Sequence, residues 1–414
     1  MGISKHIAPH SRGKKKKDKI FYYGGLAKQA IAKHGPDAVI NATIGALLDE
    51  QSALALLPSV EEAGRRLETV AFAPYAPVAG TNEFRQDVID YIYEGVENRP
   101  NLGSIATSGA TGALRLAIWD FLEQGDAVVT HDYFWAPYRA ITEDAGRELM
   151  TFETFEADNS FNVAGAIAAT EQALAERDRT LLLINTPCHN PTGGSITGSE
   201  MGQLKKELDR ICSENPDKNL TLLIDAAYWE FGDAEENRTL LETFVDLPEN
   251  FVFCFAFTLS KSLTRYGLRT GALLFAAHDP QVVDDIAGVM TTSVRVHWSN
   301  TCHLGQRLFS EVFRDEGLRA QLKAEQKAFA DVCNERGKIF VEEAVQVGLP
   351  HTPFAGGFFL TLPTPNPEPI ANELCKENIF LVPLAKGVRV ALCAIPTKKI
   401  PGLAKRIKAV FGEG

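Results

Sequence analysis

A lysine closes one of the most apolar runs of the chain, and its position could give it a chemical role. The run NFVFCFAFTLSK spans residues 250–261 and ends at Lys261. Between Lys261 and Gly271 the only charged residues are Arg265 and Arg269, both positive. Burial and positive neighbours both disfavour a protonated amine, and a neutral lysine amine is a nucleophile that forms Schiff bases with carbonyl compounds. The alternative is a solvated lysine just past a strand end, the ordinary place for this residue type.

Polar residues follow other predicted strands at comparable points. Asn190 comes after the run LLLI (181–184), and Asp225 directly follows LTLLI (220–224), with Tyr228 three residues later. Short continuous apolar runs that alternate with helical segments are typical of a parallel sheet covered on both faces. Ligands of such sheets bind at the carboxyl ends of the strands. We therefore expect these polar residues and the lysine to meet at one edge of the sheet.

These residue types match the needs of one cofactor, pyridoxal phosphate. Its aldehyde requires a lysine that can lose its proton, and its ring nitrogen works in an electron sink only when a carboxylate such as Asp225 keeps it protonated. Its phenolic oxygen requires hydrogen-bond donors, which Asn190 and Tyr228 can supply. Its phosphate requires a cation and the backbone N–H groups of a helix N-terminus, and the chain offers Arg269, Ala110 and Thr111.

Each of these residues also has an ordinary structural interpretation. Asp225 could cap a turn, NPTG (190–193) could be a simple Asn-Pro turn, and SGATG (108–112) could be a loop with a helix cap. Arg269 could be a surface charge. Their joint occurrence in this order, at the ends of successive strands, favours the cofactor site.

Composition excludes several classes of function. A net charge of −11 over 414 residues argues against a general nucleic-acid binder. Seven cysteines lie scattered without a CxxC pair or metal-ligand spacing, which indicates reduced thiols, a cytoplasmic location and no metal centre. No apolar run approaches the roughly 20 residues of a membrane span. The charged run KKKK (14–17) has no apolar core after it, so we interpret it as a solvated tail rather than a secretory signal.

The order of predicted elements divides the chain into two parts. Residues 1–20 are predicted to form a flexible arm. Strands and helices then alternate to about residue 304, after which a long helical stretch leads to a small α+β region. We expect a large domain over 51–304 and a smaller domain formed by 1–50 and 305–414.

Several longer segments resemble the class I/II aminotransferases of pyridoxal-phosphate fold type I, and most closely the aspartate/aromatic branch of that family. The resemblance covers about residues 40 to 396 and rests on INATIGALLDE (40–50), YAPVAGTNEFR (75–85), SGATGALRLA (108–117), FWAP (134–137), CHNPTG (188–193), DAAY (225–228) and TLSK (258–261), with Arg269 following. It implies an α/β fold in which a mostly parallel seven-stranded sheet is flanked by helices in a large domain, beside a smaller α+β domain. It also implies a homodimer with shared active sites.

The resemblance assigns catalytic and cofactor-binding roles to individual residues. Lys261 would carry the cofactor as a Schiff base and act as general base, and Asp225 and Tyr228 would complete the catalytic set. Trp135 would stack on the pyridine ring, and Thr258 stands where the family has a phosphate-binding serine. The other cofactor contacts that the resemblance implies are Ala110, Thr111, Asn190, Arg269 and, on the phosphate bound by the partner subunit, Tyr75.

The resemblance also assigns substrate contacts. Arg389, in GVRVALCAIP (387–396), matches the residue that grips the α-carboxylate of the amino acid, a task suited to a planar guanidinium. Arg295, in SVRVHWSN (293–300), matches the arginine that comes from the partner subunit and binds the side-chain carboxylate of aspartate or glutamate. The remaining implied substrate contacts are Asn190 and the covering residues Ile44 and Gly45. The implied reaction moves the amino group of an L-amino acid to a 2-oxo acid.

Alternatives to this reaction stay open. An arginine at position 295 can move aside and admit a ring, so an aromatic-specific aminotransferase fits the same pattern. A lyase or decarboxylase can use the same scaffold, because a fold does not determine the reaction. A non-enzymatic ligand sensor would carry a DNA-binding domain ahead of this one, and residues 1–40 are too short for it.

The sequence departs from the aspartate enzymes at three points. Tyr138 stands where they usually have a histidine behind the ring-nitrogen carboxylate, so the surroundings of Asp225 are expected to differ. Ala110 replaces a glycine of the phosphate loop, which requires a negative φ at that position. The WEF segment (229–231) is bulkier than usual and could reshape the mouth of the pocket.

Overall fold

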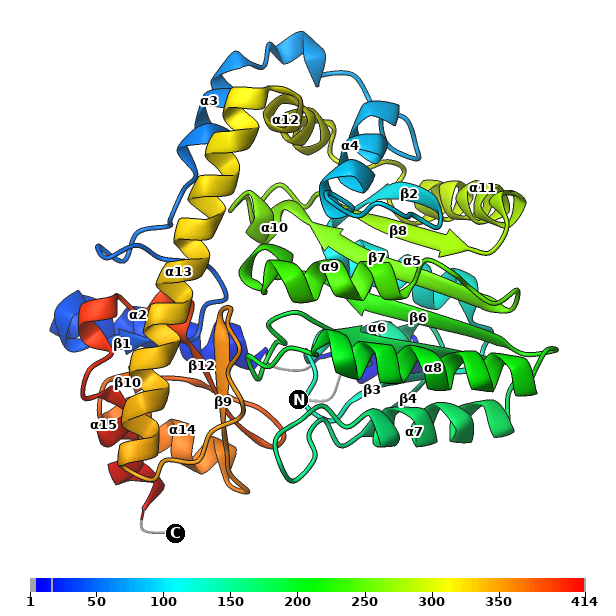
Figure 1. Cartoon of the computed structure of the whole chain (residues 1–414). Helices are drawn as coiled ribbons and strands as arrows, with labels where there is room; N and C mark the ends of the chain where they lie inside the picture. The colour runs from blue at the N-terminus through cyan, green and yellow to red at the C-terminus, as the bar shows by residue number, and fades with distance from the viewer. Residues whose placement is uncertain (1–4, 16–17, 413–414) are drawn as a thin grey trace.

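A seven-stranded sheet forms the centre of the larger body (Figure 1). The computed structural model describes residues 5–15 and 18–412. The strands lie in the order β2-β8-β7-β6-β5-β3-β4. Only β8 runs antiparallel to its neighbours, so the expectation of a mostly parallel seven-stranded sheet is confirmed. The strands are β2 Asn101–Thr107, β3 Ala127–His131, β4 Glu148–Phe152, β5 Arg179–Asn185, β6 Asn219–Asp225, β7 Phe251–Thr258 and β8 Gly271–Ala277.

Both faces of the sheet are buried, which explains why its central strands are continuous apolar runs. In β5, Leu181 and Leu183 belong to the core on one face, whereas Leu182 and Ile184 belong to the core on the other. The first face is covered by α5 (Gly109–Phe121), α6 (Pro137–Asp144) and α11 (Pro280–His297). The second face is covered by α4 (Asn82–Ile92), α7 (Val163–Ala175), α8 (Gly198–Glu214), α9 (Ala234–Thr243) and α12 (His303–Arg314).

A smaller body lies beside the sheet and contains α2, β1 and the C-terminal end of the described chain. Its antiparallel sheet has the order β11-β12-β9, and a parallel pair joins β1 to β10. The pair ties the N-terminal segment to the C-terminal part of the chain. Its elements are α2 (Lys19–His34), β1 (Ile40–Asn41), β9 (Phe359–Pro363), α14 (Pro367–Lys376), β10 (Ile379–Phe380), β11 (Val382–Pro383), β12 (Gly387–Ala391) and α15 (Leu403–Phe411).

The long helix α13 (Glu316–Gln346) runs from one body to the other (Figure 1). Its first part packs in the core of the large sheet through Leu318 and Leu322. Its later part packs in the core of the smaller body through Cys333 and Phe340. We therefore keep the division into two domains as a proposal and place the change of core within α13, C-terminal to residue 304.

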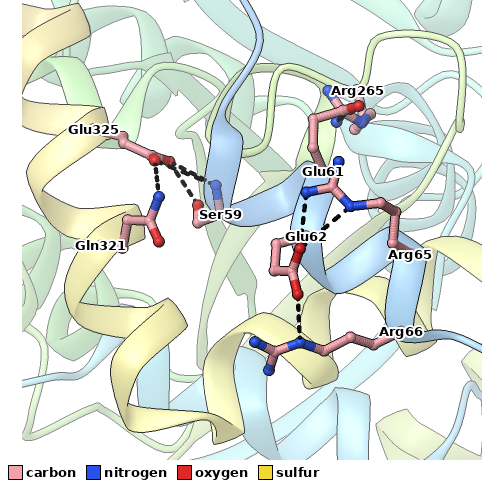
Figure 2. Close-up of polar contacts among 8 residues, drawn as sticks. All are labelled: Ser59, Glu61, Glu62, Arg65, Arg66, Arg265, Gln321 and Glu325. Atoms are coloured by element: carbon pink, nitrogen blue, oxygen red, sulfur yellow. Dashed lines mark hydrogen bonds and ion pairs between the residues drawn. The ribbon is translucent and has the colours of Figure 1, made fainter.

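The helix α3 (Pro58–Arg66) connects α13 to the segment that follows Lys261 (Figure 2). Glu325 of α13 accepts hydrogen bonds from the backbone N and the hydroxyl of Ser59, at 3.2 and 2.6 Å. A carboxylate at the N-terminus of a helix satisfies free N–H groups and complements the helix dipole. At the other contact, Glu61 pairs with Arg265. Two surface arginines of α3 pair with its own Glu62 in the same view.

The remaining elements are short. They are α1 (Pro9–Arg12), α10 (Leu259–Ser262) and the 3₁₀ turns η1 (Pro36–Ala38), η2 (Thr69–Ala71), η3 (Trp229–Phe231), η4 (Leu392–Ala394) and η5 (Thr397–Lys399). Within residues 1–20, for which we expect a flexible arm, α1 and the first two residues of α2 are helical; the flexibility of this arm stays a prediction. Lys16 and Lys17 of the KKKK run lie outside the described residues. Within the described ranges, no helix has the length and apolar character needed to cross a membrane.

Candidate active site

A cavity of about 220 Å³ opens at the carboxyl ends of β5, β6 and β7. Its walls come from these strand ends, from the N-terminus of α5 and from β9 and β12 of the smaller body. Most of the predicted site residues line it, namely Gly45, Ala110, Thr111, Trp135, Asn190, Asp225, Tyr228, Thr258, Lys261, Arg269 and Arg389. The polar residues that follow the predicted strands therefore line the same cavity.

Lys261 stands in the short helix α10, directly after β7. Thr258 caps this helix by accepting a hydrogen bond from the backbone N of Ser260 at 3.2 Å. The Lys261 amine lies 5.4 Å from the centre of the Tyr228 ring. Burial lowers the pKa of Lys261 to about 8, with Arg269 acting in the same direction and Asp225 opposing it. A substantial neutral fraction is therefore present at mildly alkaline pH, as a nucleophile or base requires.

Asp225 closes β6 and is buried, with 4% of its surface exposed. Its Oδ2 atom accepts a hydrogen bond from the Tyr138 hydroxyl at 2.5 Å, whereas its buried Oδ1 has no hydrogen-bond partner among the described residues. Burial raises the pKa of this carboxyl, and the Tyr138 hydrogen bond and the Lys261 charge lower it. A buried oxygen left without a partner is costly, so Oδ1 is a natural acceptor for a donor on a bound ligand.

The N-terminus of α5 forms an anion-binding corner of the cavity. Gly109 has φ +68°, and a Cβ atom there would lie 2.7 Å from Nη2 of Arg269, so only glycine allows this close approach. Ser108 does not cap the helix with its side chain, which leaves the first N–H groups available. Arg269 donates to the Ser260 hydroxyl at 3.2 Å. Free N–H groups, a guanidinium and hydroxyls together suit a phosphate.

Ala110 occupies the first turn of α5 and does not have a positive φ. The backbone at position 110 therefore tolerates a side chain, as the replacement of a glycine by Ala110 requires.

Arg389 reaches the opposite side of the cavity from β12 and is 3% exposed. It donates to the Asn190 side-chain oxygen at 3.3 Å and to the backbone oxygen of Thr43 at 3.1 Å. Its guanidinium lies 4.2 Å from the centre of the Phe359 ring. It forms no ion pair with a carboxylate of the described residues, and its Nε atom is buried without a partner. A buried guanidinium in this state is suited to a carboxylate ligand.

The sequence and the fold of the whole chain match a known family. The family model described as aminotransferase class I and II covers residues 37–407. The chain belongs to this family of pyridoxal-phosphate-dependent aminotransferases. It is 28% identical to an aspartate aminotransferase of Pseudomonas aeruginosa, over 75% of this chain and 77% of that one. It is equally similar, at 28%, to a tyrosine aminotransferase of Klebsiella pneumoniae, over 69% of this chain and 71% of the other.

Solved structures agree with this assignment. An aminotransferase from Anaerococcus prevotii is 36% identical, with a TM-score of 0.95 and 99% of each chain covered. An aromatic-amino-acid aminotransferase from Burkholderia pseudomallei, solved covalently bound to pyridoxal phosphate, shares the fold at 22% identity and a TM-score of 0.79, over 95% of this chain and 97% of that one. The chain therefore has the fold of the type I aminotransferases.

Three predicted site residues of this aminotransferase lie outside the wall of the cavity. Tyr75 is 90% exposed, between η2 and α4. Arg295 is exposed on α11, where its guanidinium donates to the Ser299 hydroxyl at 2.8 Å. Ile44 is half-buried, and its neighbour Gly45 lines the cavity instead. The roles of Tyr75 and Arg295 were expected across a subunit boundary, so they stay predictions.

Several residues of the cavity wall were missed. Asn185 accepts a hydrogen bond from the backbone N of Asn190 and donates one to the backbone O of Asp225, both at 2.6 Å. It therefore sets the spacing between the ends of β5 and β6. Its position as the last residue of the LLLIN run was the signal that could have identified it. The other missed residues are Ile20, Ala227, Ser260 and Phe359.

Proposed function

We propose that this chain is an aminotransferase that moves the amino group of L-aspartate or L-glutamate to a 2-oxo acid, with pyridoxal phosphate bound through Lys261. One observation carries the proposal. A single cavity brings together a lysine of lowered pKa, a buried carboxylate oxygen without a partner and a buried arginine without a carboxylate partner. These are the groups that the cofactor aldehyde, its ring nitrogen and the substrate carboxylate require.

The residues present fit the cofactor at each of its polar ends. Asp225 Oδ1 would face the ring nitrogen, and Asn190 and Tyr228 would face the phenolic oxygen. Trp135 lies in the cavity wall, where its ring would stack on the pyridine. The phosphate would take the N-terminus of α5 with Ala110, Thr111, Thr258 and Arg269. When bound, pyridoxal phosphate stabilises the electron pair left at the α-carbon of the amino acid.

The residues of the chain position the substrate and move its proton. Arg389 would bind the α-carboxylate, because its buried guanidinium already has a fixed orientation between Asn190 and Thr43. With a pKa of about 8, Lys261 can take the α-proton and return it near neutral pH. Phe359 and Ile20 form apolar parts of the wall and would exclude water from this proton transfer.

The dicarboxylate preference is supported by Arg295 and its sequence context. In a homodimer, the partner subunit's Arg295 would meet the side-chain carboxylate of the substrate, and the partner's Tyr75 would meet the cofactor phosphate. The second candidate is an aromatic-amino-acid aminotransferase. It is favoured by the similarity to a tyrosine aminotransferase and by the exposure of Arg295. Among the described residues its guanidinium contacts the Ser299 hydroxyl alone, so that it is free to move aside.

The seven cysteines are all free, and this supports the proposal of a reducing, cytoplasmic location.

The test is the visible absorption of the purified protein with pyridoxal phosphate, before and after L-aspartate is added without any oxo acid. We expect a lysine-linked cofactor band that aspartate converts to the amine form of the cofactor, with release of one oxaloacetate per site. L-Phenylalanine is the matched substrate control. A band that responds only to phenylalanine would assign the aromatic specificity, and continuous release of pyruvate or alanine would assign a lyase or decarboxylase.

A further inference from the structure

The hydroxyl of Tyr138 is committed to one partner inside the protein. The residue lies in the first turn of α6 and is fully buried. Its hydroxyl donates to Asp225 Oδ2 at 2.5 Å, a short distance typical of a hydrogen bond to a charged oxygen. Its ring meets Trp135 edge to face at 5.7 Å between ring centres. The segment 135–138, which leads into α6, therefore supplies both a wall of the cavity and the donor to the carboxylate.

This hydrogen bond determines which oxygen of Asp225 is free. Oδ2 is occupied by Tyr138, and Oδ1 is the buried oxygen without a partner. The backbone oxygen of Asp225 is held by Asn185 at 2.6 Å. The carboxylate is thus held through Oδ2 and the backbone of the residue is anchored by Asn185, which leaves Oδ1 to receive a ligand.

The titratable groups around this pair differ in their response to pH. Burial raises the pKa of both Tyr138 and Tyr228 well above the usual tyrosine value. His131, whose Nε2 accepts from the backbone N of Asn185 at 3.3 Å, has a pKa lowered by burial to about 4. Burial therefore favours the neutral form of all three groups, and Lys261 is a further neighbour of Asp225, with a pKa that burial lowers to about 8.

We propose that Tyr138 is the positioning residue of Asp225, holding the carboxylate ionised and oriented toward the cofactor ring nitrogen through a donor that does not titrate. This inference rests on the proposed function, because it concerns how the chain keeps that nitrogen protonated. A histidine in the same place would couple the carboxylate to a group that titrates near neutral pH. The tyrosine makes the ring-nitrogen contact independent of pH.

The test compares Tyr138→Phe with Tyr93→Phe, using the holoenzyme. Tyr93 is also fully buried, but its hydroxyl has no hydrogen-bond partner among the described residues, so this control removes a buried hydroxyl without breaking such a bond. The first readout is the dissociation constant for pyridoxal phosphate. The second is the pH at which the visible absorption of the bound cofactor changes.

We expect Y138F to bind pyridoxal phosphate about tenfold or more weakly than the wild type, since a hydrogen bond to a buried charge is lost. The absorption transition should move to higher pH by about one unit, because a less protonated ring repels the proton of the lysine linkage less. Y93F should match the wild type in both readouts. Equal behaviour of Y138F and Y93F would overturn the proposal.

Tyr138→His provides a second and independent comparison. The imidazole can again donate to Asp225, so we expect affinity for pyridoxal phosphate between those of Y138F and the wild type. The imidazole should also add a second transition to the visible absorption of the bound cofactor between pH ~5 and 8. If Y138F does not fold, a single wild-type-like transition in Y138H overturns the proposal. A wild-type protein that binds no pyridoxal phosphate overturns the proposed function and this inference together, whereas normal wild-type binding with an unchanged Y138F overturns only the inference.

Discussion

The carboxyl edge of the large sheet and the outer surface that carries Tyr75 and Arg295 hold the same kinds of predicted ligand-binding residue, but the chain buries them very differently. In the cavity at this edge, Arg389 reaches in from β12 and is 3% exposed, whereas on the outer surface Tyr75 is 90% exposed. Arg389 has a fixed orientation between two protein oxygens. Arg295 is held by the hydroxyl of Ser299, just past the end of its own helix. The residues of the first region meet within one chain, and the second region presents its residues outward.

This difference shows what a single chain can organise by itself. Strand pairing sets the inner residues at fixed positions, as in the register of Asn185 opposite Asp225 and of Thr258 opposite Gly271. In the part of the chain that the structure describes, no strand pairing brings Tyr75 or Arg295 to the cavity. On our account, mutation of an inner residue should impair the site of the same subunit. Mutation of an outer residue should impair only the site of the partner subunit.

The largest effect is expected from Lys261→Ala, which removes the central group of the inner region. Without the amine, both the cofactor linkage and the proton transfer are lost, and proton transfer alone contributes a factor of about 10²–10⁴. Turnover with aspartate and 2-oxoglutarate measures the loss. The exposed Lys327, which pairs with Asp331, is the control for removal of a lysine. Wild-type-like transamination by K261A would show that the cavity is not the active site.

Arg389→Lys keeps the charge of the inner region but removes the planar fork. We expect kcat/KM for aspartate to fall roughly tenfold to a hundredfold, since hydrogen bonds to charged groups are each worth about 1.5–3 kcal/mol. Steady-state kinetics measures the change, with the exposed Arg65→Lys as the matched substitution. An unchanged kcat/KM in R389K would remove Arg389 from the substrate site.

Mixing two inactive variants tests the outer region. K261A lacks the inner lysine, and Arg295→Ala lacks the outer arginine. In a mixed dimer that shares residues across its interface, one site keeps both groups, so random exchange should restore roughly a quarter of the wild-type activity with aspartate. Activity after co-refolding of the two variants measures this. If the activity of the mixture equals the summed activities of the two separate variants, the outer residues do not complete a neighbouring site.

The smallest predicted effect is on the free energy of unfolding and comes from Glu230, close to the inner region. Glu230 follows Tyr228 in η3, and its Oε2 atom is buried without a partner, while Oε1 accepts from Tyr91 at 2.9 Å. Burial raises the pKa of Glu230 from 4.5 to about 7. The native state therefore binds more protons than the unfolded state between these values, and stability falls as pH rises through this window. The fall is at most about 3 kcal/mol.

Glu230→Gln should remove most of that decline. Urea unfolding at pH 5 and pH 8 measures it, with the exposed Glu335→Gln of α13 as the control. We expect the wild type and E335Q to lose stability between the two pH values and E230Q to lose much less. An equal loss in all three proteins would show that the Glu230 carboxyl is not responsible.

Several of the residues that line the inner cavity could be placed from the sequence because they follow strands. Asn190, Asp225 and Lys261 could be placed from apolar runs alone, since the ends of parallel strands share one edge. Asn185 was missed because its contact depends on the turn that brings the Asn190 backbone back to it. Ile20 was missed because α2 reaches the cavity only through the packing of the smaller body, which no local pattern describes.

The point at which the chain passes from one core to the other is also not visible in the sequence. The change from α/β alternation to helical pattern is visible near residue 304, but the core changes later, within α13. Leu308 and Phe313 of α12, C-terminal to residue 304, still pack in the core of the large sheet. A continuous helix that serves two cores gives no local signal at the point of change.

The most direct test of the central claim is the location of the cofactor on the chain. The protein is loaded with pyridoxal phosphate, reduced with borohydride to make the linkage permanent, digested and mapped by mass spectrometry, with K261A treated in parallel. We predict one modified peptide, carrying the pyridoxyl group on Lys261, and none at comparable yield in K261A. Modification of another lysine at equal yield in both proteins would contradict the account.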